Sequence, residues 1–178
     1  LILRPALPTE SERLWQLIYV DPVWKKYDAP YYPHEQEELE SFRLGTMARF
    51  IEGDSALLID FEGEVVGSVS AHWEDRATRW LELGIVLYSD QHWGKKIGRR
   101  ALTLWLDHLF KSQDVARIGL TTWSGNPRMI RCAESVGMVV EGRLRQVRYF
   151  EGVYYDSIKM GVLRTEWEAN EFTIQKKY

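Results

Sequence analysis

The sequence lacks several features that mark whole classes of protein. Its 178 residues include a single cysteine, Cys132, so no internal disulfide can form, and we expect a reducing, cytoplasmic compartment. No apolar run approaches the roughly 20 residues of a membrane span, and no secretory signal opens the sequence, so we expect no membrane partner. No Lys/Arg run exceeds two residues and the formal net charge is -3, which argues against a nucleic-acid partner. The histidines show no metal-ligand spacing, so we expect no metal.

Linker-like and repeated segments are also absent, and the length fits one domain, which we predict to cover residues 1–178. The small net charge hides an asymmetry between the two halves. Residues 1–90 carry 17 acidic and 8 basic residues, a net of -9, whereas residues 91–178 carry 9 acidic and 15 basic residues, a net of +6. This division indicates two opposed fields, one suited to an anionic ligand and the other to a cationic one.

Hydrophobic periodicity and turn residues predict an alternation of strands and helices. The expected strands cover residues 1–5, 55–60, 64–73, 80–88, 116–123, 138–147 and 153–163. The expected helices cover residues 9–18, 34–50, 97–109 and 127–136, with an aromatic loop at residues 21–32. This order predicts an α/β fold in which a mixed sheet carries helices on both faces and ends in a hairpin.

Cations gather between the predicted central strand and the helix that follows it. Four of them lie within six positions: Lys95, Lys96, Arg99 and Arg100. Cations at a helix start oppose the macrodipole, whereas the free N–H groups there bind phosphate well. Gly94 and Gly98 would let the backbone approach a bulky anion. We therefore predict a phosphate site, with a solvated basic turn as the alternative. The P-loop and dinucleotide-binding patterns are both absent.

Residues 93–98, Trp-Gly-Lys-Lys-Ile-Gly, after residues 83–87, Leu-Gly-Ile-Val-Leu, resemble the acetyl-CoA signature of the GNAT superfamily of N-acetyltransferases. In that signature a Gln/Arg-x-x-Gly-x-Gly/Ala turn holds the pyrophosphate. The resemblance extends to residues 3–5, 126–137, 141–145, 152–156 and 166–167, and it is similar to the Rim type, which acetylates ribosomal-protein amino termini. It implies the GNAT fold, with a mostly antiparallel mixed sheet of about seven strands, and direct attack of an amine on acetyl-CoA in a ternary complex.

The resemblance also implies the cofactor contacts. They are Ile85, Val86, Leu87, Trp93, Gly94, Lys95, Lys96, Ile97, Gly98, Arg99, Asn126 and Arg131. Backbone amides of residues 85–87 would polarise the thioester carbonyl, and Asn126 would orient the pantetheine arm or a water. An ordinary helix N-cap role for Asn126 is compatible with this.

The sequence departs from the family pattern at three positions. Lys96 stands where the first signature glycine usually lies, and Trp93 replaces the Gln/Arg. Ala133 occupies the place of the general-acid tyrosine of many members, so the proton donor to the CoA thiolate stays unassigned. Cys132 could suggest an acyl-cysteine intermediate, but its mid-helix position favours a role as small core filler.

Glu82 is the candidate catalytic base, because it lies inside the apolar run 80–88, where burial strengthens a carboxylate as a base. The alternative is that it pairs with Arg79 or another cation on a sheet face. At pH 7 an α-amine is roughly one-seventh free, against about one part in 2,500 for a lysine, which favours a protein N-terminal α-amine as acceptor.

The sequence is compatible with more than one acceptor, more than one role for its aromatic residues and more than one oligomeric state. The acceptor could instead be a small amine, such as a polyamine or an antibiotic-like amine, and a catalytically silent acyl-CoA-binding domain is a further alternative. The aromatics of residues 24–32 and 148–155 would either line the acceptor groove or seal the core. A homodimer is compatible with the sequence.

Overall fold

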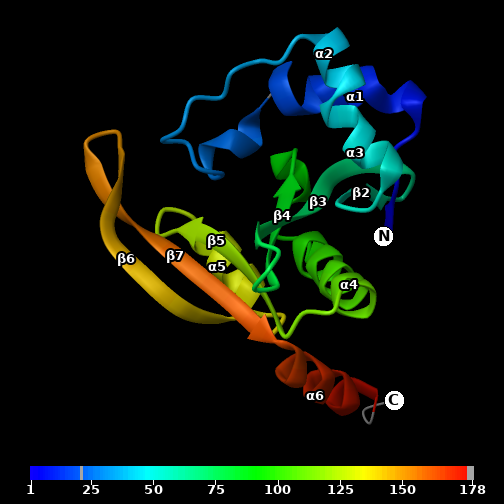
Figure 1. The fold of residues 1–178 in the computed structure, drawn as a ribbon. Coiled ribbons are helices and arrows are strands. Elements are labelled where there is room, and N and C mark those ends of the chain that lie inside the picture. The colour runs from blue at the N-terminus through cyan, green and yellow to red at the C-terminus, as the bar shows by residue number, and fades with distance from the viewer. Residues whose placement is uncertain (21, 176–178) are drawn as a thin grey trace. The chain divides into compact units, whose positions relative to one another are not determined.

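The computed structural model of the chain describes residues 1–20 and 22–175 and divides into two compact units. One unit comprises Leu1–Ala71 with Gly84–Ala101, and the other comprises His72–Leu83 with Leu102–Tyr178. The seven strands pair in the order β1-β2-β3-β4-β5-β7-β6 (Figure 1). The β4–β5 pair is parallel, and β1–β2, β2–β3, β5–β7 and β6–β7 are antiparallel. The predicted fold class is therefore confirmed, while a single domain over residues 1–178 stays a prediction.

The first unit combines the amino-terminal strands with short helices. Its elements include β1 (Ile2–Arg4), α1 (Ser11–Trp15), α2 (Leu39–Leu44), α3 (Thr46–Glu52) and β2 (Ala56–Phe61). Two further elements, β3 (Glu64–Asp75) and β4 (Trp80–Leu87), contribute residues to both units. Glu62 and Gly63, at φ values of 57° and 85°, form the turn between β2 and β3. Positive φ at both central residues is typical of a type I′ hairpin turn, so the predicted hairpin is confirmed.

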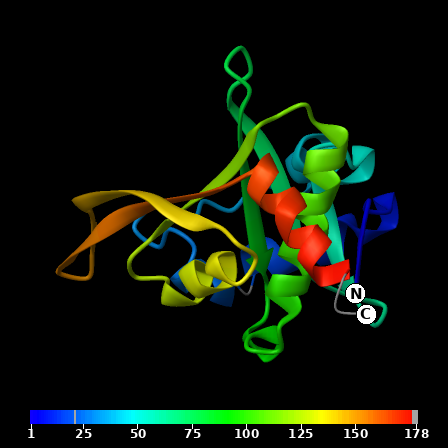
Figure 2. The same ribbon diagram turned by 90° about the horizontal axis from the view of Figure 1, so that it is seen from below.

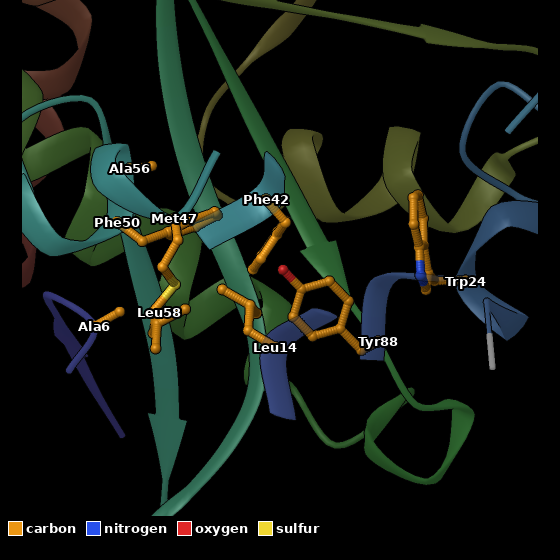
Figure 3. Close-up of a cluster of buried hydrophobic side chains, with 9 residues drawn as sticks. All are labelled: Ala6, Leu14, Trp24, Phe42, Met47, Phe50, Ala56, Leu58 and Tyr88. Atoms are coloured by element: carbon orange, nitrogen blue, oxygen red, sulfur yellow. The ribbon is translucent and has the colours of Figure 1, made fainter. Parts of the chain in front are cut away.

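A cluster of buried side chains holds this unit together (Figure 3). Its members come from segments far apart in the sequence: Ala6, Leu14, Trp24, Phe42, Met47, Phe50, Ala56, Leu58 and Tyr88. The Trp24 ring meets the Tyr88 ring edge-on, with centroids 6.3 Å apart. For Trp24, the structure therefore supports a core-sealing role for the aromatic loop. Asp21, the first residue of that loop as predicted, lies outside the described residues.

The predicted helix over residues 34–50 is wrong in its start and its continuity. The helical residues begin only at Leu39, and Gly45, at φ -114° and ψ -83°, separates α2 from α3. Hydrogen bonds to Glu37 instead hold the extended segment before α2 in place. Its carbonyl accepts the Trp15 indole N–H at 2.6 Å, and its carboxylate accepts the Thr46 hydroxyl at 2.8 Å. These bonds replace the first helical turn that the run of glutamates suggested.

The second unit contains the longest hairpin of the chain. Its elements are α4 (Ile97–Ser112, from Leu102 onward), β5 (Arg117–Trp123), α5 (Pro127–Glu134), β6 (Val139–Phe150), β7 (Val153–Leu163) and α6 (Arg164–Gln175). β6 and β7 form a long twisted ribbon (Figure 1). Helix α6 was not predicted from the sequence. It lies beside α4 (Figure 2), and the Trp167 ring stacks on the Phe110 ring with centroids 6.2 Å apart.

Candidate active site

The basic turn lies in the first unit, between the end of β4 and the start of α4. Trp93 anchors it: its indole N–H donates to the Leu87 carbonyl at 3.3 Å, and its ring meets the Tyr27 ring edge-on at 5.1 Å. Ile97, the first residue of α4, is buried. The turn is therefore held at one end by Trp93 and at the other by the buried Ile97, while residues 94–96 between them are exposed.

The backbone of this turn passes twice through the left-handed region. Gly94 has a φ of 76° and Lys96 a φ of 62°. Left-handed backbone is costly for a residue with a side chain, and glycine is its usual occupant. Lys96 thus adopts a glycine conformation at the position where the resemblance places a glycine. The lysine at this position therefore does not prevent the left-handed backbone that a glycine would adopt.

The donors on the turn suit a pyrophosphate. Lys95, Lys96, Arg99 and Arg100 are all exposed, and the first turn of α4 contains no acidic residue. The first amides of a helix have no partner within the helix and carry a partial positive charge. Open space surrounds the α-carbon of Gly94, so an anion can approach the backbone there. Cationic side chains and the first amides of a helix together form the donor set that a phosphate group requires.

The residues expected to polarise the thioester form the carboxyl-terminal half of β4, also in the first unit. Residues 85–87 are partly buried, and the neighbouring strand β3 lies hard against them. A Cβ atom on Gly67 would lie 2.2 Å from the Val86 carbonyl oxygen, so only glycine fits there. This contact positions the backbone of residues 86 and 87, but nothing tests their predicted role toward the thioester.

Glu82 lies in the other unit, on the first half of β4, and it is 2% exposed. Its Oε1 accepts hydrogen bonds from the Trp80 indole at 2.8 Å and from Arg117 Nη1 at 3.0 Å. Its Oε2 is buried and has no hydrogen-bond partner in the described part of the chain. The ion pair agrees with the alternative interpretation of Glu82, although the partner is Arg117; Arg79 pairs with Asp114 instead. The role of Glu82 as a base stays a prediction.

Arg117 and Glu141 were not anticipated from the sequence. Arg117 holds two carboxylates, because its Nε also donates to Glu141 Oε2 at 2.9 Å. Burial alone would lower the pKa of Arg117, but its hydrogen bonds to Glu141 and Glu82 outweigh burial and raise the pKa. The arginine is therefore a permanent cation beside Glu82. The signal that points to this network is a pair of strand glycines, Gly119 and Gly161, which oppose each other across β5 and β7.

Asn126 and Arg131 lie in the second unit, at the turn into α5 and on that helix. Asn126 is the N-cap: its side-chain oxygen accepts the Met129 amide at 3.1 Å, directly before Pro127. Ala133 is fully buried, so the position of the missing tyrosine belongs to the core. Cys132 is partly buried on the same helix. The cofactor roles predicted for Asn126 and Arg131 stay predictions.

Within residues 1–20 and 22–175, no helix is long and apolar enough to cross a membrane. The same residues contain no group of three His, Cys, Asp or Glu side chains placed to hold a metal ion.

The known proteins that resemble this chain are acetyltransferases. The model of the acetyltransferase (GNAT) domain matches residues 1–139. YdaF of Bacillus subtilis (strain 168), which by name is a ribosomal N-acetyltransferase, is 25% identical over 111 residues. That match covers 62% of this chain and 60% of YdaF, so the similar segment is less than two thirds of that relative.

Two further proteins match over more of their length. The ribosomal-protein-serine acetyltransferase of Escherichia coli (strain K12) is 24% identical over 146 residues, which are 80% of this chain and 81% of that enzyme. The spermidine N-acetyltransferase of Vibrio cholerae, solved with CoA and spermine, superposes with a TM-score of 0.75 at 20% identity over 94% of this chain and 97% of that one. At this identity the superposition shows a shared fold. The names of YdaF and of the Escherichia coli enzyme agree with the Rim-type resemblance, whereas the Vibrio cholerae protein is named for a polyamine.

Proposed function

Because the chain belongs to the GNAT family of acetyltransferases, we propose that it transfers an acetyl group from acetyl-CoA to a primary amine, the α-amine of a protein N-terminus. The single observation that carries this proposal is the exposed basic turn at the start of α4, with Lys96 in a glycine conformation. A solvated turn would have no reason to keep a strained backbone at a lysine. A turn that binds pyrophosphate needs that backbone to aim its amides.

The residues divide the work of the reaction. When bound, acetyl-CoA supplies an acetyl thioester for attack by the amine. Lys95, Lys96 and Arg99, with the amides of residues 94–98, would hold the pyrophosphate, Arg131 would add a cation, and Asn126 would orient the pantetheine arm. Backbone amides of residues 85–87 would donate to the carbonyl oxygen as negative charge develops there.

Glu82 is proposed to take the proton of the attacking ammonium, directly or through a water. The geometry supports this role at one oxygen only. Oε1 is occupied by Trp80 and Arg117, whereas Oε2 is buried without a partner among the described residues. A buried carboxylate oxygen left without a hydrogen bond costs about 1–3 kcal/mol, so Oε2 favours a bound N–H or O–H donor. The ion pair and the base role are thus compatible.

The names of the relatives are compatible with two classes of acceptor amine. Proteins named for ribosomal-protein and for spermidine acetylation both resemble this chain at about the same identity. We favour the α-amine because it is free at neutral pH to a far greater extent than an alkylamine, and position 133 offers no general acid. Polyamine acetylation is the second candidate, supported by the fold shared with the spermidine N-acetyltransferase of Vibrio cholerae.

A single assay separates these candidates. The protein is incubated with acetyl-CoA and, in parallel, with peptides that differ in their first residue, with spermidine and with an aminoglycoside, while free thiol is followed. We expect thiol release with at least one peptide to exceed that with spermidine about tenfold or more in kcat/KM. Faster release with spermidine would establish the second candidate. Release no faster than hydrolysis with every amine would indicate a domain that only binds acyl-CoA.

A further inference from the structure

The hairpin of the second unit contains a bulge whose residues line a cavity. Leu144 pairs with Ser157 and Arg148 with Tyr155, so residues 145–147 of β6 lie opposite Asp156 alone. Gln146, in this bulge, has a φ of 56°. A β-bulge and a non-glycine residue in the left-handed region each cost free energy of folding. Both features are concentrated at functional sites, where the cost is offset by the function. This cavity is an open hollow in the surface of the hairpin, with a volume of about 770 Å³, and it is lined by Arg143, Arg145, Gln146 and Asp156, of which only Asp156 is partly buried.

Asp156 organises the wall of this cavity. Its carboxylate accepts the Gln146 backbone N–H at 2.9 Å and Arg143 Nη1 at 2.8 Å. The hydrogen bond from Gln146, joined by that from Arg143, lowers the pKa of Asp156, so the carboxylate is ionised at neutral pH. The negative charge of Asp156 is paired with the positive charge of Arg143, and this ion pair fixes the position of both side chains.

Arg145 is the second cation of the lining. Its side chain is exposed, and its charge, like that of Arg143, acts on the Asp156 carboxylate and helps to lower the pKa of Asp156. Two guanidinium groups and one carboxylate give the lining a formal charge of +1. A guanidinium presents its donors as a fork that matches a carboxylate, and beside a second arginine it has a strong preference for an anion over a cation.

Asp156, which lines the cavity, is hydrogen-bonded to the turn that contains Asn126. The Ser124 amide donates to the Asp156 carbonyl at 3.0 Å, and the Asp156 amide donates to the Ser124 hydroxyl at 2.9 Å. Ser124 lies two residues before Asn126 in the sequence. A ligand in the cavity therefore lies beside the β5–α5 turn, to which the proposed function assigns contact with the cofactor.

We propose that Arg145, with Arg143 fixed by Asp156, binds a carboxylate of the acceptor, so that the substrates are peptides with an acidic side chain close behind the reacting amine. This inference rests on the proposed function and specifies its substrate class. It also disfavours polyamines, since a polycation would place like charge against the lining. The recognising group is the exposed guanidinium of Arg145, and Arg143 and Gln146 line the space around it.

The test compares matched peptides that begin with serine and have an amidated carboxyl terminus. Three pairs carry Glu or Gln at position two, three or four, and both the Kd and kcat/KM are measured. In the unaltered protein we expect the Glu peptide of at least one pair to bind about tenfold more tightly than its Gln partner, which is the size of one charge-assisted contact. In Arg145→Gln this preference should fall below about twofold, and Arg145→Lys should retain part of it.

A matched control is Arg76→Gln, which removes an exposed arginine that lies over the Trp73 ring of the same unit. The preference must persist in this variant. No preference in any pair, or one that survives Arg145→Gln, overturns the proposal. So does a CoA affinity that falls with Arg145→Gln, because the cavity would then bind a cofactor phosphate.

The two proposals fail in different ways. Acetylation of the peptides without any preference for Glu would support the proposed function and contradict the carboxylate site. Binding that prefers Glu, without acetylation of any peptide, would support the carboxylate site and contradict the proposed function.

Discussion

Glu82 occupies the space that a side chain on Gly119 would need. The two residues are partners in the parallel pairing of β4 and β5, and a Cβ on Gly119 would lie 2.5 Å from Glu82 Oε1. Gly161 has the same relationship to Glu141, whose carboxylate oxygens lie 2.5 Å from the position of an added Cβ. Two strand glycines thus make room for the carboxylates that Arg117 joins.

Gly119→Ala should therefore break the contact between Glu82 and Arg117. The new methyl group displaces the ends of both side chains, and we expect a loss of about 1–3 kcal/mol in the free energy of unfolding because a buried carboxylate loses its partner. Gly142→Ala is the control, since a Cβ there would lie 3.8 Å from its nearest neighbour in Lys159. Urea denaturation measures both variants. Equal stability of Gly119→Ala and Gly142→Ala would contradict this account of Gly119.

Glu82→Gln tests the proposed base. The substitution keeps the shape of the side chain and removes its ability to take a proton, so we expect turnover to fall about 100-fold or more. The Kd of acetyl-CoA should not change. The control is Glu141→Gln, which alters the other carboxylate on Arg117 and should retain turnover within about threefold. Turnover that survives in Glu82→Gln would return Glu82 to a purely structural ion pair.

The elements of the sheet were predictable from the sequence because their signals are local. Alternating apolar residues and the Glu62–Gly63 turn identify β2 and β3 without reference to the rest of the chain. The helix over residues 34–50 was misjudged because the spacing of its apolar residues continues across Gly45. Helix α6 was missed because its anchor is distant: Arg164 donates to the carbonyl oxygens of Phe110, Gln113 and Val115.

The parts of the candidate site that depend on a local sequence pattern were predictable. A charged residue within an apolar strand identifies Glu82, and the glycines and cations identify the basic turn. The partner of Glu82 could not be found in this way, because Arg117 is 35 residues away and meets it only through the register of two parallel strands. The Arg145 cavity depends on a bulge in β6, and sequence periodicity does not reveal a bulge.

The conformation of Lys96 can be separated from its charge with two substitutions. Lys96→Ala removes the charge and keeps a Cβ in the left-handed region, whereas Lys96→Gly removes both the charge and the strain. We expect Lys96→Gly to be about 1 kcal/mol more stable to unfolding than Lys96→Ala, with equal affinity for CoA. Thermal unfolding and titration with CoA measure the two quantities. Equal stability would show that the left-handed backbone at residue 96 carries no strain.

The ion pairs of Arg4 predict how the stability of the first unit depends on pH. Arg4 Nη2 contacts Glu10 Oε1 at 2.7 Å, and this hydrogen bond is the main reason that the pKa of Glu10 is lowered. A pKa lowered by folding adds stability above the ordinary value of about 4.3, and this stability is lost as the pH falls through the lowered pKa.

The unaltered protein should therefore exceed Glu10→Gln in stability by a constant amount, about 1 kcal/mol or less, above pH 5 or so, and the difference should shrink below it. Glu12→Gln, which removes a neighbouring exposed acid of α1 and leaves the Arg4–Glu10 contact intact, is the control for the loss of one negative charge. A difference that grows as the pH falls would contradict the assignment.

The basic turn makes a prediction about ionic strength. Lys95 and Arg99 are exposed, so their attraction to a bound pyrophosphate is screened by salt, with a Debye length of about 10 Å at 0.1 M. Lys95→Gln and Arg99→Gln should each raise the Kd of CoA about two- to fivefold at low salt, and the difference should largely vanish at 1 M salt. Lys111→Gln, at the opposite end of α4, is the matched control and should bind CoA normally at every salt concentration. If the two turn variants bind CoA as the unaltered protein does, residues 95–99 form a solvated basic turn, and the phosphate must be held elsewhere.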